Sequence, residues 1–110
     1  MPRRLLTDFE LMVLLAILRV GDEAYGVPIA REIEQTAGRV VVLGAIYAAL
    51  ERLAATGLVA STMGNPTPER GGRAKKFFRV TREGVRAVRD TRRALTALWT
   101  DVPVLAGEPT

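Results

Sequence analysis

The stretch GGRAKKFFRVT, residues 71–81, combines the features that organise the rest of this chain. Two glycines give a hinge, a cluster of cationic side chains follows, and the final threonine is placed to cap a helix. Between them the side chains alternate as in a strand, with Phe77 and Arg79 on one side and Phe78 and Val80 on the other. A basic hairpin arm that ends at a helix is suited to reach an anionic polymer. The stretch therefore predicts the wing of a winged helix-turn-helix.

The composition argues against an enzyme. The chain has 110 residues, enough for one domain with a modest core, and it contains neither Cys nor His. The usual zinc sites, histidine bases, thiol nucleophiles and hydrolytic triads are therefore excluded. No pair of carboxylates lies in the obviously apolar setting that would favour acid–base catalysis. We expect no catalytic residues, no metal site and no cofactor.

Basic side chains are concentrated in the second part of the chain. Residues 1–69 carry six basic and eight acidic side chains, whereas residues 70–110 carry ten basic and four acidic. This one-sided positive charge indicates an anionic partner, either nucleic acid or a membrane surface. The longest apolar run, residues 11–18, is shorter than the roughly 20 residues that span a bilayer, and the first residues do not resemble a signal peptide. We expect a soluble, cytoplasmic protein that does not enter a membrane.

The first helix is expected to be covered from two sides. Thr7 and Glu10 fit a capping box that opens a helix running to about Val20. Its residues are apolar on nearly every side, whereas a helix that lies only on its own domain needs one apolar stripe. In so short a chain the second cover is another subunit. The alternative, that a few leucines are simply exposed, stays open.

Two helices separated by a short strand are expected next. The second helix opens at residues 25–28 and stops at Gly38, and the third runs over residues 44–56 before Gly57. The β-branched residues 40–42 predict a short strand that pairs with the hairpin. The expected inner faces are Ile29, Ala30, Ile33 and Ala37 in the second helix, and Ile46, Ala49, Leu50 and Leu53 in the third.

The hairpin leads into a long final helix. Residues 58–63 predict its first strand, and residues 64–72 its tip, because proline and glycine exclude regular structure there. The final helix is expected from Thr81 to about Val102, which makes it about 33 Å long and longer than the headpiece can cover. Along it run a heptad seam, Val85, Val88, Arg92, Leu95, Trp99 and Val102, and a solvated face, Arg82, Arg86, Arg89 and Arg93, partly paired with Glu83 and Asp90. This helix should project and pair with a second copy.

The element order gives the fold class and the domain organisation. Helix, helix, short strand, helix, strand, wing, strand and helix make a mainly α (α+β) protein, a winged helix-turn-helix with an added C-terminal dimerisation helix. We expect a DNA-binding domain over residues 1–80, the dimerisation helix over residues 81–102 and a flexible tail over residues 103–110.

Four motifs follow one another along the chain: DEAYGVPI (22–29), GAIYAALERL (44–53), GLV (57–59) and GRAKKFFRVTREG (72–84). In this order they resemble the PadR family of bacterial transcription regulators, in its short branch with a single C-terminal helix. The resemblance covers roughly residues 5–102. It implies a homodimer that binds a roughly palindromic operator, often as a repressor of transporter genes that is released by a small ligand or by competition.

Two positions depart from the family pattern. Leu43 and Ala45 flank Gly44, where the family often has Ser and Thr. Phe77 and Phe78 stand in the wing strand where the family usually has two tyrosines. A phosphate contact that depends on those hydroxyl groups is not expected in this chain.

The third helix and the wing are expected to contact DNA, since the second helix of a helix-turn-helix lies in the major groove. The expected contact residues are Tyr25, Gly44, Ala45, Tyr47, Ala48, Arg52, Arg70, Arg73, Lys75 and Lys76. Only Arg52 can grip guanine bidentately, while Ala45 or Ala48 can touch thymine methyl groups, so backbone contacts should supply much of the affinity. The alternatives are tyrosine rings that are half-buried, that of Tyr47 against the wing, and a basic loop that is merely solvated.

The final helix is expected to supply the dimer interface together with the start of the chain. The expected interface residues are Leu5, Phe9, Met12, Val88, Leu95, Leu98, Trp99 and Val102. The resemblance also implies a hydrophobic pore between subunits, in which tryptophan stacks on flat ligands. Phe9, Met12, Leu95 and Trp99 would line such a pore for a small aromatic or hydrophobic effector. Packing at the dimer seam is the simpler account of Trp99.

Two functions from different classes are therefore open. One is a dimeric repressor that binds double-stranded DNA. The other is a winged-helix module for protein–protein association, because the third helix is rich in alanine and poor in base-reading donors. The clustered cations of the wing favour DNA, since an association module has no need of them.

Overall fold

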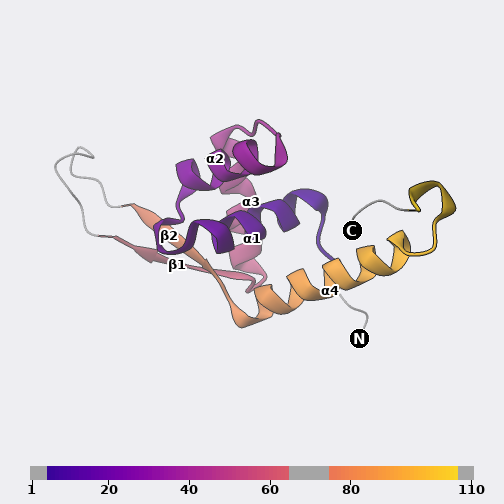
Figure 1. Ribbon diagram of the computed structural model, residues 1–110. Coiled ribbons are helices and arrows are strands. Elements are labelled where there is room, and N and C mark those ends of the chain that lie inside the picture. The colour runs from indigo at the N-terminus through magenta and orange to yellow at the C-terminus, as the bar shows by residue number, and fades with distance from the viewer. Residues whose placement is uncertain (1–4, 65–74, 107–110) are drawn as a thin grey trace.

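The computed structural model describes residues 5–64 and 75–106 (Figure 1). Its helices are α1 (Asp8–Val20), α2 (Gly26–Ala37), α3 (Leu43–Ala55) and α4 (Arg82–Trp99), its strands are β1 (Val59–Met63) and β2 (Lys76–Val80), and its 3₁₀ turns are η1 (Gly21–Glu23) and η3 (Pro103–Leu105). The predicted fold class is confirmed: the protein is mainly α, a winged helix-turn-helix with an added C-terminal helix. Most of the predicted hairpin tip, including Arg70, lies outside the described residues, and so does Arg73, which follows the tip.

The hydrophobic core lies where α1, α2 and α3 pack together. The capping box of α1 is confirmed, because the Thr7 hydroxyl accepts the Glu10 N–H at 3.1 Å and the Glu10 carboxylate accepts the Thr7 N–H at 2.9 Å. The largest fully buried side chains are Leu14, Ile29, Ile46, Leu50, Leu53 and Val13. The predicted inner face of α3 is thus confirmed. Ala37 is exposed, contrary to expectation, because the last turn of α2 passes beyond the core.

The two strands form an antiparallel hairpin that closes one side of the core. Val59 of β1 pairs with Val80 of β2. Phe78 is buried whereas Arg79 is exposed, which confirms the alternation predicted for this strand. The Phe78 N–H donates to the Ala24 carbonyl at 2.8 Å, so β2 is also tied to the segment before α2.

The strand predicted over residues 40–42 is wrong. These residues form an extended linker between α2 and α3 and make no strand in the described structure. In the described structure the backbone of β2 bonds instead to Ala24, through the Phe78 N–H. The middle valine of the linker is partly buried against the core, and the outer two are exposed.

Helix α4 ends at Trp99, three residues before the predicted end at Val102. Thr100 turns to an extended conformation with ψ 141°, and Asp101 has φ 62°. The cause lies in the sequence, because the residue before Pro103 disfavours helical geometry and Thr and Asp are weak helix formers. The helix is therefore about 27 Å long, and Val102 does not continue the helical seam.

Thr81 fixes the direction in which α4 leaves the sheet. Its hydroxyl accepts the Gly84 N–H at 3.1 Å and donates to the Gly57 carbonyl at 2.6 Å. Gly57 has φ 80°, a left-handed conformation that favours glycine after a helix. One side chain thus caps α4 and holds it against the turn that ends α3, as the sequence predicted for both caps.

A second attachment of α4 lies at Thr91, which the sequence analysis did not single out. The Thr91 hydroxyl accepts the N–H of Leu6 at 3.0 Å, and both residues are buried. This bond joins the middle of α4 to the segment that precedes α1.

Thr91→Val is expected to lower the free energy of unfolding by about 1–3 kcal/mol, because the buried Leu6 N–H would lose its acceptor. Urea unfolding followed by circular dichroism measures the change. The matched control is Thr62→Val on the exposed part of β1, which should alter the same quantity by less than about 0.5 kcal/mol. Equal stability of the two variants would contradict a structural role for the Thr91 bond.

Candidate nucleic-acid interface

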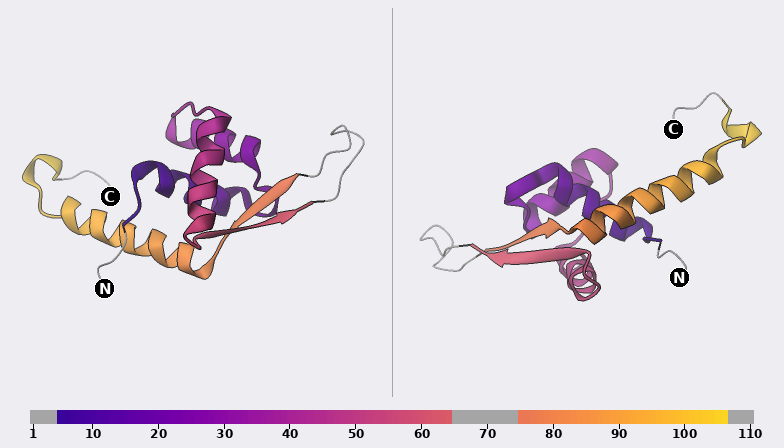
Figure 2. Two further views of the ribbon diagram at one scale, coloured as in Figure 1. Left: turned by 180° about the vertical axis from the view of Figure 1, so that it is seen from behind. Right: turned by 90° about the horizontal axis from the view of Figure 1, so that it is seen from below.

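Helix α3 has one buried face and one open face. The residues opposite its core face are Gly44, Ala48, Glu51 and Ala55, and all of them are exposed. Figure 2 (left) shows α3 in front of the other helices, with none of the described elements lying over it. Arg52 is exposed at one flank of this face, and Ala45 is partly buried there. The open face is narrow enough to enter a major groove, which admits an α-helix.

Tyr47 lies at the other flank of α3, against the first residue of α2. An added Cβ at Gly26 would overlap the Tyr47 ring, so the two helices approach closely there. The ring therefore packs on α2 and not on the wing, while Tyr47 stays 45% exposed. Within the described residues its hydroxyl makes no hydrogen bond. This hydroxyl is therefore available as a donor to a group outside the described part of the chain.

Tyr25 holds the base of the wing against the start of α2. The Lys75 ammonium lies 3.8 Å from the centre of the Tyr25 ring. The Phe77 ring meets Tyr25 edge-on, with centroids 5.8 Å apart. Such cation–π and edge-to-face contacts stabilise by about 0.5–1 kcal/mol each at exposed sites. The wing therefore has a defined direction where it leaves the domain.

Two of the predicted wing cations lie in the described part of β2 and just before it. Lys76 is exposed, with its ammonium 5.8 Å from the centre of the Phe78 ring, and Lys75 is half-buried. Neither forms an ion pair within the described residues. Their charges are thus open to an anionic partner.

Arg39 is a further cation near α3 that the sequence analysis missed. Its guanidinium lies 5.0 Å from the centre of the Phe9 ring and 3.6 Å from an Asp8 carboxylate oxygen. These contacts place a half-exposed cation in the linker that leads into α3. The position of this cation directly before the β-branched residues 40–42 could have indicated it, but those residues were predicted to form a strand.

The arginines of α4 are arranged as predicted, although without the expected ion pairs. Arg82, Arg86, Arg89 and Arg93 are exposed on the face of α4 opposite the buried Gly84 and Thr91. Among the described residues none of them pairs with Glu83 or Asp90. This face is therefore a solvated basic stripe, turned away from the domain.

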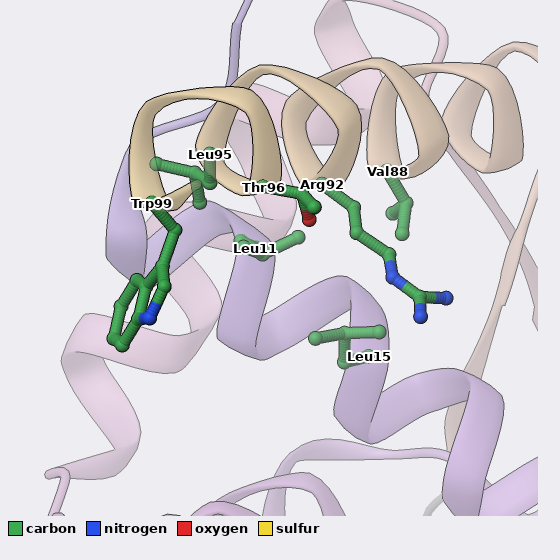
Figure 3. Close-up of a pocket in the computed structure, with 7 residues that line it drawn as sticks. All are labelled: Leu11, Leu15, Val88, Arg92, Leu95, Thr96 and Trp99. Carbon is green, nitrogen blue, oxygen red and sulfur yellow. The ribbon is translucent and has the colours of Figure 1, made fainter. Parts of the chain in front are cut away.

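A groove between α1 and α4 forms a second candidate site, called here the α1–α4 groove (Figure 3). It has a volume of about 320 Å³ and is lined by Leu11, Leu15, Val88, Arg92, Leu95, Thr96 and Trp99. Figure 3 shows the Trp99 indole at one end and the Arg92 guanidinium at the other. A mostly apolar groove with one cation at its rim suits a hydrophobic or aromatic ligand.

Of the residues predicted to line a ligand site, the α1–α4 groove contains Leu95 and Trp99. The structure places Phe9 beside Arg39, and the Met12 sulfur 3.9 Å from the same guanidinium. Leu11 and Leu15 of α1 face the groove instead. Because α1 is apolar on nearly every side, periodicity could not decide which of its faces meets α4.

The second half of α4 exposes much apolar surface in the single chain. Leu95, Leu98 and Trp99 are exposed, Leu98 most of all at 76%, and Leu5 at the start of the chain is also exposed. Val88 is partly buried against the core. Figure 1 and both views in Figure 2 show this half of α4 extending beyond the three-helix body.

Residues 5–64 and 75–106 contain no cluster of His, Cys, Asp or Glu side chains that could hold a metal ion. No helix within these same ranges is long and apolar enough to cross a bilayer.

The fold is shared with many solved structures. A PadR family transcriptional regulator from Eggerthella lenta has a TM-score of 0.70 and 25% identity, covering 92% of this chain and 83% of its own. A PadR-like transcriptional regulator from Bacillus cereus has a TM-score of 0.70 and 23% identity, covering 91% and 93%. A PadR-like transcription factor from Bacteroides fragilis has a TM-score of 0.71 and 23% identity, covering 89% of each chain. Curated proteins gave no significant match.

The sequence itself also matches a family. The model of the transcriptional regulator PadR-like family matches residues 14–90, from the middle of α1 to the middle of α4. The match includes α2, α3 and both described strands, which together form the candidate interface. The chain therefore belongs to the PadR-like family of transcriptional regulators, a family of DNA-binding regulators and not of enzymes.

Proposed function

We propose that this protein is a homodimeric repressor that binds a roughly palindromic DNA operator with α3 in the major groove and the wing on flanking DNA. The main support for the proposal is that the start of α2 contacts both α3 and the base of the wing. Tyr47 packs on Gly26 at one side, and the adjacent Tyr25 holds Lys75 at the other. A base-reading helix and a phosphate-binding arm thus have a fixed relation to each other, as a helix-turn-helix requires. The protein would act in the cytoplasm, where bacterial DNA lies.

The apolar surface of α4 supports the homodimer. Leu95, Leu98 and Trp99 lie on a helix that has no buried residue beyond Thr91 in the single chain. An exposed apolar stretch of this kind marks an interaction site, and the same stretch on a second copy is the partner of matching chemistry. A dimer would present two α3 helices to two half-sites about one duplex turn apart.

A small hydrophobic or aromatic effector in the α1–α4 groove would release the operator. The groove lies on the same helix as the proposed dimer seam, so a ligand there can change how α4 meets its partner. Trp99 lines the groove and is the only tryptophan of the chain. Binding of a flat aromatic compound is therefore expected to quench the tryptophan fluorescence.

Replacing Lys75 and Lys76 together by Ala is expected to weaken DNA binding at all sequences and to reduce the salt slope of the binding constant by about two. The reason is that each cation that meets a phosphate releases a counterion. Fluorescence anisotropy of a labelled duplex at several salt concentrations measures the slope.

The matched control is Arg86→Ala with Arg93→Ala, which removes the same net charge from the solvated stripe of α4. The control should leave the slope nearly unchanged. If the salt slope fell equally in both double variants, net charge alone would account for the change. If the slope changed in neither variant, the proposed wing contact would be contradicted. The protein–protein association module would then be the better account.

A further inference from the structure

Three exposed apolar side chains lie where α3 begins. Val40 is 76% exposed, Val42 is 72% exposed and Leu43 is 41% exposed. The linker is extended at Val42, with φ −76° and ψ 147°, and Val41 turns inward to pack against the core. Side chains alternate along an extended segment, so the valines on either side of Val41 point away from the domain. The three exposed residues are called here the apolar tip of α3.

The apolar tip lies at the N-terminal end of α3, the end that is expected to contact bases. In helix-turn-helix proteins the N-terminal residues of the recognition helix contact base edges. Residues 40–46 read VVVLGAI, and none of these side chains can donate or accept a hydrogen bond. Arg39 is directed to Phe9 and Asp8, and Arg52 lies about 13 Å further along the helix axis. Direct hydrogen bonding to bases is therefore not available at this end of the helix.

Apolar side chains recognise one group on the base edges of the major groove, the C5-methyl group of thymine. We infer that the apolar tip of α3, formed by Val40, Val42 and Leu43, selects operators by contact with thymine methyl groups. The inference rests on the proposed function and specifies how it is carried out. It predicts half-sites that contain thymine at fixed positions.

The surroundings of the tip suit DNA as its partner. Tyr47 follows it on α3 with a hydroxyl that makes no hydrogen bond within the described residues. This hydroxyl can donate to a phosphate beside the groove that the tip would enter. An added Cβ at Gly44 would meet open space, with nothing within 4 Å, so packing inside the chain does not require a glycine there. The absent side chain leaves room for a base edge to approach the helix.

The test uses duplexes that the intact protein enriches from a random library. In the best of them, each thymine of a half-site is replaced in turn by deoxyuridine, which removes only the methyl group. Loss of one contacted methyl is expected to weaken binding about fourfold. Fluorescence anisotropy at constant salt measures each dissociation constant.

Protein variants assign the methyl contacts to the tip. In Val42→Ser the loss of affinity caused by deoxyuridine should disappear at the DNA position that Val42 contacts. In Val40→Ser it should disappear at the position that Val40 contacts. Val104→Ser is the matched control, because Val104 is 85% exposed in η3 and should leave every penalty unchanged. Both substituted valines of the tip are exposed, and a melting temperature equal to that of the unsubstituted protein verifies the fold.

The other possible outcomes contradict the methyl contact, its assignment to the tip, or DNA binding itself. Enrichment of specific duplexes with no deoxyuridine penalty at any position would overturn the methyl contact but leave the DNA-binding function intact. Penalties that persist in both valine variants would overturn the assignment to the tip. If no duplex is enriched, the proposed function fails as well, and a change in oligomeric state in Val42→Ser would then identify the tip as a contact between copies.

Discussion

Trp99→Asp is expected to convert the proposed dimer to a monomer at micromolar concentration. Trp99 is 44% exposed in the single chain and lies among the exposed leucines of α4. Truncated aromatic anchors typically cost at least about 2 kcal/mol of binding, and a buried unpaired carboxylate adds to this, so the dimer should weaken by roughly 100-fold or more. Sedimentation velocity measures the oligomeric state directly.

The control for this substitution is Val104→Asp, which places the same charge on an exposed residue beyond the end of α4. It should remain dimeric. The monomeric variant should also lose most of its operator affinity, because one half-site then has to bind alone. A Trp99→Asp protein that sediments as a stable dimer would mean that the interface lies away from the second half of α4.

Gly84→Val is expected to be the most destabilising substitution at the junction of α4 with the sheet. An added Cβ would overlap the Leu58 carbonyl oxygen and the Val80 side chain. The Leu58 carbonyl accepts the Thr81 N–H at 3.0 Å, so it cannot move aside without losing that bond. Overpacking of this kind should cost about 3 kcal/mol, which lowers the melting temperature by at least about 10 °C.

Gly44→Ala is the control, since it also places a Cβ in the first turn of a helix. Nothing lies within 4 Å of that position, so the change should stabilise the fold slightly, by about 0.5 kcal/mol. Differential scanning calorimetry compares the two variants. A Gly84→Val protein that melts within about 2 °C of the unsubstituted chain would contradict the close packing at this junction.

The local signals in the sequence were strong enough to predict most of the fold. Thr7 with Glu10, and Thr81 before α4, are caps whose chemistry is contained within a few residues, and both form as expected. The spacing of Ile46, Ala49, Leu50 and Leu53 gave the buried face of α3 for the same reason. Family resemblance then identified the class of regulator, which the match to residues 14–90 confirmed.

The misses concern contacts between distant segments. Three consecutive valines favour a strand locally, but they pair with no strand in the described structure, and the Phe78 N–H of β2 bonds to Ala24. The helical period continues past Trp99 in the sequence, but the approach to Pro103 ends the helix first.

The candidate sites also depend on contacts between segments that are distant in the sequence. The Lys75–Tyr25 contact and the packing of Tyr47 on Gly26 join residues whose partners no pattern along the chain could identify. In α1, apolar residues all round left two faces equally suited to α4, and the structure brings Leu11 and Leu15 to the groove.

The most direct test of the central claim is a competition titration. A labelled duplex, taken from the DNA upstream of the gene or enriched from a random library, is titrated with the protein in an excess of unrelated duplex at two salt concentrations. A sequence-reading α3 predicts binding that survives the competitor, with a preference of at least about 10³-fold over unrelated DNA. Equal affinity for both duplexes, lost together as salt rises, would contradict sequence recognition by α3 and leave only the cations of the wing.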